Sequence, residues 1–541
     1  MNSAHDISDA QALVVGGGPV GLALAIELGT RGHQVIVLEQ RSRTGSQPRA
    51  KTTNVRTMQH LRRWGVSEAL RSAAPLPRDY PTDVVFATTL FGHRLALIEN
   101  AFEGAKRRDD RFPEAAQWVP QYTVEAVLRE RLARLPNVSF RLEARLEHAE
   151  QTNIGVVATA RDLKADRPFV VRAEYLIGAD GARSDVRKLI GARMEGEHAL
   201  AHHYNLILRI PEFERSPPSP RAIMYWLVNP QSPAVMSPLE KGIWAFGTSL
   251  APGLREINDA ELQRRVYAAV GRPIDYEILE RDIWAAHRLI ADRYRNGRMF
   301  LAGDACHLHP PFGGYGMNLG IADGVDLGWK LSAVLQGWGG EALLASYEQE
   351  RRPVHLRTIA EAVENFRTLS ADLLAENLDD DGAAGERARA AVNAEIVAKK
   401  SREFQTLGVV LGSRYEASPI IAEEGGPPPE EHHARYRRSA HPGSLAPHAW
   451  LADGGSLYDR FGQGYTLLML HPAGEAFAGE ISAAASIKGV PLLVLDVRSE
   501  HLCELYGAPL ALIRPDQHVA WRGSKGDPKK LMCMVSGAVV E

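Results

Sequence analysis

Three glycines near the start of the chain, Gly16, Gly18 and Gly21, follow the spacing G-x-G-x-x-G. In this spacing the first glycine permits a tight turn, the second lets the backbone approach a pyrophosphate, and the third lets a helix pack closely on a strand. The pyrophosphate would lie at the N-terminus of the following helix, where unpaired N–H groups favour an anion. Glu39 follows at a distance from which a carboxylate can hydrogen-bond a ribose hydroxyl. These residues predict a dinucleotide site, and the acidic side chain favours an unphosphorylated ribose, as in FAD or NAD.

A second loop with ligand-binding chemistry lies between Asn296 and Leu331. Asp304 stands at the end of an apolar segment, where a carboxylate can accept hydrogen bonds from a sugar or polyol. The glycines that follow let backbone N–H groups approach a ring closely; they are Gly313, Gly314 and Gly316. His307 and His309 are spaced like metal ligands, but no third ligand is evident in the sequence, so we expect no metal.

The segments around these residues supply the elements that position them. Leu13 to Val15 is expected to form a strand, Val20 to Gly29 a helix, and Val35 to Leu38 a second strand that ends at Glu39. A glycine turn alone is common, but the complete β-α-β unit makes nucleotide binding the better interpretation. Around Asp304, Met299 to Ala302 is expected to form a strand, and a helix is expected to begin at about Met317.

Composition narrows the class of protein. A length of 541 residues suggests three or more domains, and 45% hydrophobic with 24% charged residues is an ordinary globular composition. A net charge of −3 gives no general attraction to nucleic acid. The three cysteines form no C-x-x-C pair, the polar N-terminus lacks the order of a signal peptide, and the most apolar stretch contains Glu27. We therefore expect a cytoplasmic protein with no membrane span and no nucleic-acid partner.

The first 200 residues also contain other predicted elements. A helix is expected over Asn54–Arg63, a hairpin over Asp83–Glu99, and a helix over Gln121–Leu135 with Thr123 as its N-cap. The next three strands suggest an antiparallel meander, over Val138–Leu146, Ile154–Ala160 and Phe169–Ile177. The meander leads to a turn and a short helix that Ser184 is expected to cap.

Later segments change in character. His203 to Ala286 is expected to be rich in strands, with one helix at about Asp259–Val270. The aromatic side chains of this segment suit a sheet that covers a flat apolar ligand, although aromatic residues on strands are more often part of the core. They are Tyr204, Tyr225, Trp226, Trp244 and Trp284. Asn377 to Arg402 is expected to be a solvated helix or a connector, and Glu423 to His433 a linker. The remaining strands and helices suggest a small α/β domain.

Three motifs occur in the chain in the order GGGPVG, ADGARSDVR and LAGDACHLHPPFGGYGMN. With them the chain resembles the single-component (group A) flavoprotein aromatic hydroxylases, and most closely the phenol-hydroxylase-like branch with a thioredoxin-like C-terminal domain. The resemblance implies an α/β fold in which a Rossmann-like FAD-binding domain carries an inserted β-sheet substrate domain. The implied FAD-binding segments are 1–82, 107–200 and 288–372; the implied substrate segments are 83–106 and 201–287; a helical connector and linker takes 373–432; and the thioredoxin-like domain takes 433–541.

The resemblance also implies the cofactor contacts. Asp180 would lie in a motif that contacts FAD and NAD(P)H, Asp304 would hold the ribityl chain, and Gly316 to Asn318 would lie by the isoalloxazine. The full set implied for FAD is Gly16, Gly18, Pro19, Gly21, Glu39, Gln40, Arg41, Arg49, Gln121, Asp180, Asp304, Pro311, Gly314, Gly316, Met317 and Asn318. For the arginines, and for Lys51 beside them, a solvated loop is an equally good interpretation.

The implied activity is hydroxylation of a phenolic or other electron-rich aromatic substrate, usually ortho to the hydroxyl. Tightly but non-covalently bound FAD would be reduced by NADPH or NADH and would react with O2 to give a C4a-hydroperoxide. Deprotonation of the phenol requires a base, which the sequence does not identify. The candidates are His287, Tyr225 and Tyr315, and His202 and His203 are further candidates. Two positions depart from the family pattern: Tyr315, where Gln is frequent, and Cys306, where Ala is usual.

Two other interpretations stay open at this point. A flavoenzyme of the same fold could act on a polyketide or other large aromatic, or perform an epoxidation, and a non-catalytic flavin-binding assembly module would belong to another class. A small aromatic is the expected partner, and a homodimer is left open.

Overall fold

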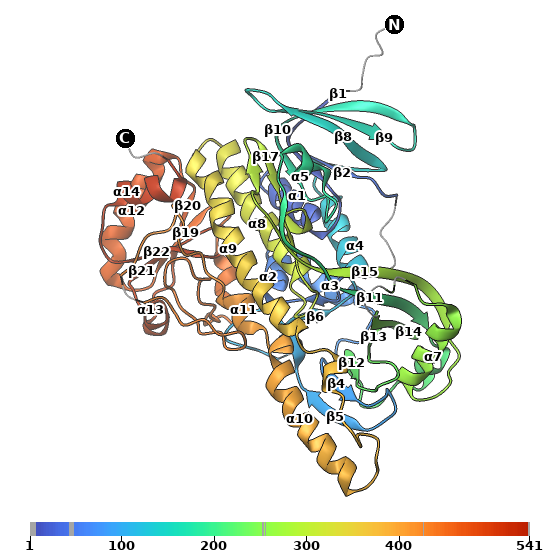
Figure 1. The fold of residues 1–541 in the computed structure, drawn as a ribbon. Helices are drawn as coiled ribbons and strands as arrows, with labels where there is room; N and C mark the ends of the chain where they lie inside the picture. The colour runs from blue at the N-terminus through green and yellow to red at the C-terminus, as the bar shows by residue number, and fades with distance from the viewer. Residues whose placement is uncertain are drawn as a thin grey trace.

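The protein is described by a computed structural model over residues 7–42, 48–105, 107–250, 254, 256–425 and 427–538 (Figure 1). The predicted β-α-β unit is present as β1 (Ile7–Val15), α1 (Pro19–Thr30) and β2 (Val35–Glu39). It lies in an eight-stranded sheet with the path β16-β17-β10-β1-β2-β7. The four strands in the middle of this path are β17 (Met299–Leu301), β10 (Arg167–Gly178), β1 and β2, and each runs parallel to the next. The α/β fold class is therefore confirmed.

The parallel pairing decides where the three motifs meet. β1, β10 and β17 lie side by side, and each ends where one motif begins: at Gly16, at Gly178 and at Ala302. Because the carboxyl ends of parallel strands share one edge of a sheet, residues almost 300 positions apart in the chain face the same crevice.

The predicted antiparallel meander is correct only in part. β8 (Ala144–Gln151), β9 (Val156–Asp162) and the first half of β10 pair antiparallel, but β7 (Val138–Leu142) runs parallel to β2 as the last strand on the sheet path. Alternation of apolar and polar residues predicts which side chains of a strand are buried, but it does not predict whether the neighbouring strand runs parallel or antiparallel.

A second eight-stranded sheet lies beside the first, in the order β18-β15-β11-β14-β13-β12-β4-β5 (Figure 1). Its longest strands are β11 (Met194–Arg209) and β15 (Glu277–Ala291), and the predicted hairpin forms its edge as β4 (Val84–Ala87) and β5 (Arg94–Ile98). The middle of the sheet is β12 (Met224–Leu227), β13 (Ala234–Glu240) and β14 (Ile243–Ser249). β18 (His307–Leu308) pairs with β15, so the loop after Asp304 belongs to both sheets.

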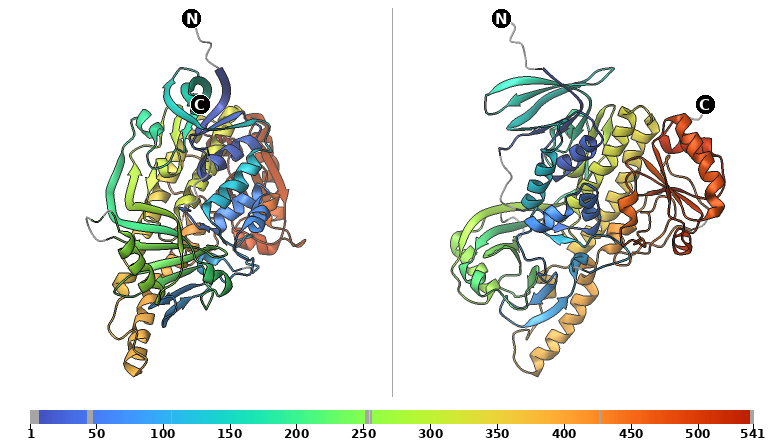
Figure 2. Two further views of the ribbon diagram at one scale, coloured as in Figure 1. Left: turned by 90° about the vertical axis from the view of Figure 1, so that its right-hand side faces the viewer. Right: turned by 180° about the vertical axis from the view of Figure 1, so that it is seen from behind.

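Helices cover the sheets. α4 (Gln121–Leu132) packs against α1, α7 (Asp259–Val270) covers one face of the second sheet, and α8 (Gly316–Leu335) and α9 (Glu341–Phe366) stand behind the motif edge (Figures 1 and 2). The short elements are α2 (Val55–Arg63), α3 (Ser67–Ala73), α5 (Asp185–Leu189), α6 (Pro211–Arg215), α11 (Leu407–Gly412), β3 (Thr52–Thr53), β6 (Gln117–Trp118) and β16 (Arg295–Asn296).

Two predictions about helices need correction. The N-cap of α4 is Pro120 and not Thr123, because Gln121 and Tyr122 already have helical conformations and Thr123 lies in the first turn. The segment expected as a solvated helix or connector forms α10 (Ala383–Phe404), but one side of it is buried against β5. Val392 and Ile396 are four residues apart and form the apolar stripe that packs there.

The C-terminal region forms a four-stranded sheet in the order β20-β19-β21-β22. β19 (Tyr465–Met469) and β20 (Leu492–Asp496) are parallel and are joined by α12 (Glu475–Lys488), whereas β21 (Leu510–Ile513) and β22 (Val519–Gly523) are antiparallel and are followed by α14 (Pro528–Ser536). With α13 (Glu500–Tyr506) this gives the β-α-β-α-β-β-α order of the expected thioredoxin-like unit. No helix in the described part of the chain is long and apolar enough to cross a membrane.

Buried charges join this region to α8 and α9. The guanidinium of Arg514, just after β21, contacts Glu350 at 2.6 Å, Asp516 at 2.7 Å and Asp326 at 3.0 Å, and Lys330 contacts Asp326 at 2.8 Å. All five side chains are buried. Burial alone would raise the pKa of Glu350, but Arg514 and Lys330 hold that pKa down at about 2. The two parts of the chain are therefore held together by a charge cluster that is satisfied only when both are present.

We expect the substitution Arg514→Met to lower the free energy of unfolding by about 3–5 kcal/mol, because it leaves the buried carboxylates of Asp326 and Glu350 with Lys330 as the one remaining cation in contact among the described residues. Urea denaturation followed by tryptophan fluorescence would measure the change. Arg498→Met is the matched control, since Arg498 pairs with Asp496 on the exposed surface and its loss should not shift the transition. Equal effects of the two substitutions would contradict the stated role of the cluster.

Candidate active site

The three motifs contact one another at the carboxyl edge of the first sheet. The N–H of Ala179 donates to the carbonyl of Val15 at 2.8 Å, and the N–H of Ala302 donates to the carbonyl of Gly178 at 2.9 Å. A Cβ on Gly16 would lie 2.2 Å from the Ala179 oxygen, so only glycine allows the first turn to approach the second motif. The structure thus brings the predicted residues Gly16, Asp180 and Asp304 together.

The glycine turn has the shape that was predicted from its spacing. A Cβ on Gly21 would lie 1.9 Å from the Gly16 oxygen, which explains the close packing of α1 on the turn. Gly18 differs, because no atom lies within 4 Å of the position that its Cβ would take. Gly18 is also the N-cap of α1, with Pro19 as the first helical residue. The open space therefore lies directly at a helix N-terminus, where a pyrophosphate fits.

Glu39 lies at the end of β2 and holds the turn from the other side. One oxygen of its carboxylate accepts the N–H of Gly17 at 2.8 Å, and the other accepts the N–H of Arg41 at 2.9 Å. The side chain stays partly exposed, so a ribose hydroxyl can still reach it. Gln40 and Arg41 follow it and are exposed, Arg49 is exposed and acts electrostatically on Asp304, and the contact of all three with a cofactor stays a prediction.

The second motif is ordered by its own carboxylate. Asp180 accepts the Ser184 hydroxyl at 2.5 Å and the N–H groups of Asp185 at 2.7 Å and Val186 at 3.1 Å, and Ser184 caps α5 as predicted. The guanidinium of Arg187 then donates to the Ala305 carbonyl at 3.0 Å. This contact fixes the second motif directly against the third.

The third motif presents Asp304 and a loop of tight turns. Burial raises the pKa of Asp304, and His307 and Arg49 oppose that shift. Gly313 and Gly314 have φ of +90° and +66°, and the Gly314 Cβ position would be 3.0 Å from the Thr52 side chain. Gly314, Gly316 and Met317 remain partly accessible, and so does Pro311, which places them at the surface of the crevice.

The side chain of Asn318 is hydrogen-bonded within the protein. Its side-chain oxygen accepts the N–H of Asn54 at 3.0 Å, and its amide nitrogen donates to the carbonyls of Thr52 at 2.9 Å and Gly314 at 2.7 Å. The side chain is therefore already used to join the loop to the N-terminus of α2, and only its backbone is free to face a ring. Gln121, on α4, hydrogen-bonds Glu125 through its side chain.

A buried carboxylate that the sequence reasoning did not single out lies behind the third motif. Asp323, on α8, accepts the N–H of Gly303 at 3.0 Å, His307 Nε2 at 3.0 Å, His355 Nε2 at 2.8 Å and Arg351 Nε at 2.8 Å. Burial disfavours its charge, yet His355 and Arg351 keep the pKa of Asp323 well below its ordinary value. No local sequence pattern marks this residue, because its partners come from α9 and from the turn after β17.

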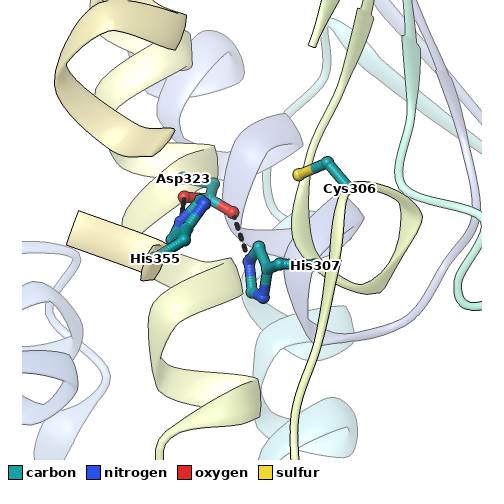
Figure 3. Close-up of side chains that lie close together, drawn as sticks. All are labelled: Cys306, His307, Asp323 and His355. Carbon is teal, nitrogen blue, oxygen red and sulfur yellow. Dashed lines mark hydrogen bonds and ion pairs between the residues drawn. The ribbon is translucent and has the colours of Figure 1, made fainter. Parts of the chain in front are cut away.

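The same region corrects the analysis of metal ligands. His307 and His309 are not a pair, since their ring centroids are 6.4 Å apart, and further ligand types, Cys306, Asp323 and His355, lie beside His307 (Figure 3). His307 and His355 both bond to Asp323, whereas the Cys306 thiol donates to the carbonyl of Gly303. Burial and Asp323 raise the pKa of that thiol, which disfavours the thiolate that a metal would need. We therefore interpret His307, Asp323 and His355 as a hydrogen-bonded network.

The three candidate bases are placed very differently. The hydroxyl of Tyr225 donates to the Pro220 carbonyl at 2.9 Å and accepts the N–H of Ala222, and burial raises its pKa. Burial also raises the pKa of Tyr315, so both phenols stay protonated. His287 accepts the N–H of Ala199 at 3.2 Å, and burial, with His198 and His202 nearby, lowers its pKa. The two tyrosines therefore cannot act as bases near neutral pH.

Lys51 is a titratable residue to which the sequence reasoning gave only a solvated or phosphate-binding role. It immediately precedes Thr52, which packs against Gly314 of the loop. Burial lowers the pKa of Lys51 to about 8, so part of its amine is unprotonated near neutral pH. Charge alone could not reveal this, because burial is decided by the packing of β3 against β6 and the loop.

Comparisons with known proteins agree with this site. A family described as FAD binding domain matches residues 9–362, and one described as aromatic-ring hydroxylase, C-terminal, matches residues 439–536. Tetracenomycin B2 monooxygenase-dioxygenase of Streptomyces olivaceus is 32% identical over 96% of both chains, and 2,4-dichlorophenol 6-monooxygenase of Delftia acidovorans is 29% identical over 97% of both. The solved structure of the rebeccamycin biosynthetic enzyme RebC superposes with a TM-score of 0.90 at 34% identity, covering 98% of this chain and 100% of that one.

The glycine turn generates a paired prediction. Gly18→Ala should fold normally, because its φ of −77° suits alanine and its Cβ points into open space, but it should weaken FAD binding at least about tenfold by filling the pyrophosphate space. Gly21→Ala should instead lower the melting temperature of the protein, since its Cβ would meet the Gly16 oxygen. Calorimetry of the FAD-free protein and FAD titration separate the two effects, and FAD affinity unchanged in Gly18→Ala would refute the assignment.

Asp323→Asn should cost about 3–5 kcal/mol of stability, because the buried Arg351 loses its counter-charge. It should also release FAD more readily, since the amide has one acceptor oxygen where the carboxylate has two, and it cannot accept from both the Gly303 N–H and Arg351. Urea denaturation and the rate of FAD loss on dilution are the two measurements. Asp185→Asn, at an exposed carboxylate on α5, is the control that should change neither. A destabilised variant that retains FAD as the wild type does would limit Asp323 to a structural role.

Proposed function

The chain belongs to the family of FAD-dependent aromatic-ring hydroxylases, and from this premise we propose that it adds one oxygen atom to a phenolic or similarly electron-rich ring, ortho to the hydroxyl. The observation that carries the proposal is the meeting of three motifs at one sheet edge, opposite a second sheet that can cover an aromatic substrate. The family is an enzyme family, which leaves no support for a non-catalytic assembly module.

The residues at the edge fit FAD. We assign the pyrophosphate to the space at Gly18, the adenosine ribose to Glu39, the ribityl chain to Asp304, and the isoalloxazine to the loop from Gly313 to Met317. Bound FAD would supply the redox chemistry, taking electrons from a nicotinamide and activating dioxygen. The chain's own contribution is to orient the ring system, to exclude water and to hold the substrate proton.

For the proton, the structure favours a different residue from the sequence candidates. A base must be unprotonated at the working pH and able to accept. Lys51, with its pKa of about 8, is partly unprotonated near neutral pH, and it immediately precedes Thr52, which lies against Gly314 of the loop. Tyr225 and Tyr315 remain protonated, and His287 lies on β15 away from that loop segment. We therefore propose Lys51 as the group that takes up the proton of the bound phenol.

Several finer features belong to the same proposal. We propose NADH or NADPH as electron donor and O2 as cosubstrate, as a monooxygenase requires. A cytoplasmic location is supported by the three cysteines, all of which are free thiols. Relatives named for 2,4-dichlorophenol and for tetracenomycin B2 are about equally similar to this chain, so family membership leaves the size of the aromatic open.

The test is a panel of single-ring and multi-ring phenols given to the purified, FAD-loaded protein. We expect at least one phenol to stimulate oxidation of NADH or NADPH and to gain one oxygen atom by mass spectrometry. Asp304→Ala should lose FAD and this activity together, whereas Asp185→Ala should keep both. Bound flavin that no phenol stimulates would overturn the proposal.

A further inference from the structure

The second sheet has two unlike faces, and only one of them is filled by its own helix. Tyr204, Tyr225 and Trp244 belong to the core beneath α7, so they are packing residues. Side chains alternate along a strand, which puts His203 on the opposite face of β11 from Tyr204. Trp284 is its direct partner on β15. The face that carries His203 and Trp284 is the one that looks toward the FAD-binding region.

His203 and Trp284 form a stacked pair on this face. Their ring centroids are 4.4 Å apart with an interplanar angle of 19°. His203 is 7% exposed, and both its Nε2 atom and the indole N–H of Trp284 are buried without a hydrogen-bond partner among the described residues. Buried polar atoms are almost always paired in native proteins, and leaving one unpaired is costly. Two such atoms on adjacent rings indicate a place where a ligand completes the bonding.

The chemistry of the pair selects the group that it can bind. Burial, with His202 nearby, lowers the pKa of His203 to about 4, so its imidazole is neutral at physiological pH. The Nδ1 atom lies 3.4 Å from the Ser249 hydroxyl, which leaves Nε2 as the second polar atom of the ring. A neutral imidazole and an indole N–H suit a group that can both donate and accept, such as a hydroxyl or an amide. The Ser249 hydroxyl can donate to Nδ1 or accept from it, and a hydroxyl or amide, which both donates and accepts, can bond Nε2 in either tautomer.

The pair is separated from the flavin loop by a row of aromatic rings. Phe366, at the end of α9, lies 6.3 Å from His203, and Phe312, in the loop itself, lies 5.6 Å from Phe366. Trp226 continues the row 6.1 Å from Phe312 on the same sheet face. Phe366 thus contacts both His203 and the loop residue Phe312, so the pair and the loop border one continuous set of aromatic rings. A flat ligand of several fused rings can lie along these aromatic walls and reach both ends.

We propose that His203 and Trp284 form a polar subsite that binds a hydroxyl or amide group at the far end of a multi-ring aromatic substrate, whose other end is presented to the flavin loop. This inference rests on the proposed function, since it takes that loop as the place of reaction. It assigns the substrate to the fused polycyclic aromatics and not to the simple phenols.

Binding of two matched probes to the FAD-loaded protein tests the subsite. 2,6-Dihydroxyanthraquinone and 2-hydroxyanthraquinone differ only in the hydroxyl at the far end, and each can be titrated through the absorbance change of the bound flavin. The wild type should bind the dihydroxy probe about tenfold more tightly, as expected for hydrogen bonds to buried polar atoms. Phenol should bind more weakly than either. Equal affinity for the two anthraquinones, or no binding of either, would overturn the proposal.

Variants of the pair distinguish hydrogen bonding from packing. Trp284→Phe keeps the stacked ring and removes the N–H, and His203→Phe removes the acceptor; each should abolish most of the preference for the dihydroxy probe while leaving 2-hydroxyanthraquinone binding within about twofold. His203→Gln retains an acceptor and should restore part of the preference. His202→Phe, on the opposite face of the same strand, is the control that should keep it. Equal weakening of both probes would show a packing role alone.

The outcomes also separate this inference from the proposed function. A probe that shows the preference but gains no oxygen would contradict hydroxylation and leave the subsite standing. A single-ring phenol that gains oxygen, combined with equal affinity for both anthraquinones, would support hydroxylation and overturn the subsite.

Discussion

The buried carboxylate of Asp323 is the interaction on which the arrangement of the catalytic half depends. It joins α8 to the turn after β17 through Gly303, and to α9 through Arg351 and His355. A carboxylate in this interior is tolerable only because a cation and several hydrogen-bond donors surround it. The turn that carries Asp304 is consequently held by α8 and α9 as well as by the short strand β17. A ligand of Asp304 would therefore bind to a turn that is supported on both sides.

A second set of polar contacts extends that support to the C-terminal domain. Arg56, on α2, donates to the carbonyl of Asp516 and to the side chain of Gln517, both after β21. The residue that caps α2, Asn54, is hydrogen-bonded to Asn318 in the loop. With the contacts of Arg514 to α8 and α9, these bonds make the C-terminal domain part of the structure that holds the loop in place, although α8 and α9 lie between it and the first sheet (Figure 2). That is a physical reason for a C-terminal domain without a redox pair.

The two sheets present different kinds of chemical group to the site. The parallel sheet presents backbone N–H groups, a helix N-terminus and carboxylates, which suit a charged, sugar-containing cofactor. The second sheet presents aromatic side chains with few polar atoms, which suit a flat organic molecule. The loop after Asp304 follows β17 of the first sheet and contains β18, which pairs with β15 of the second sheet. The register of these strands therefore sets the position of the loop relative to both sheets.

The sequence by itself determined the features that depend on local spacing. The tight turn at Gly16, the close packing at Gly21 and the position of Glu39 at a strand end follow from neighbouring residues within one β-α-β unit. The predicted hairpin, the cap at Ser184 and α7 followed from equally local signals. Family resemblance added the pairing of distant motifs, which the parallel strands then explain.

Only the tertiary structure decided the remainder, because long-range packing leaves no mark on local spacing. Asp323 and His355 are unremarkable within their own helices and acquire their role only where α8 meets α9. Alternation along β11 states that His203 and Tyr204 face opposite ways, but which of them is covered by α7 depends on the whole sheet. The side chain of Asn318 and the amine of Lys51 likewise take their roles from burial against segments far away in the chain. Spacing determined what chemistry the residues could perform, and packing determined which of them are free to perform it.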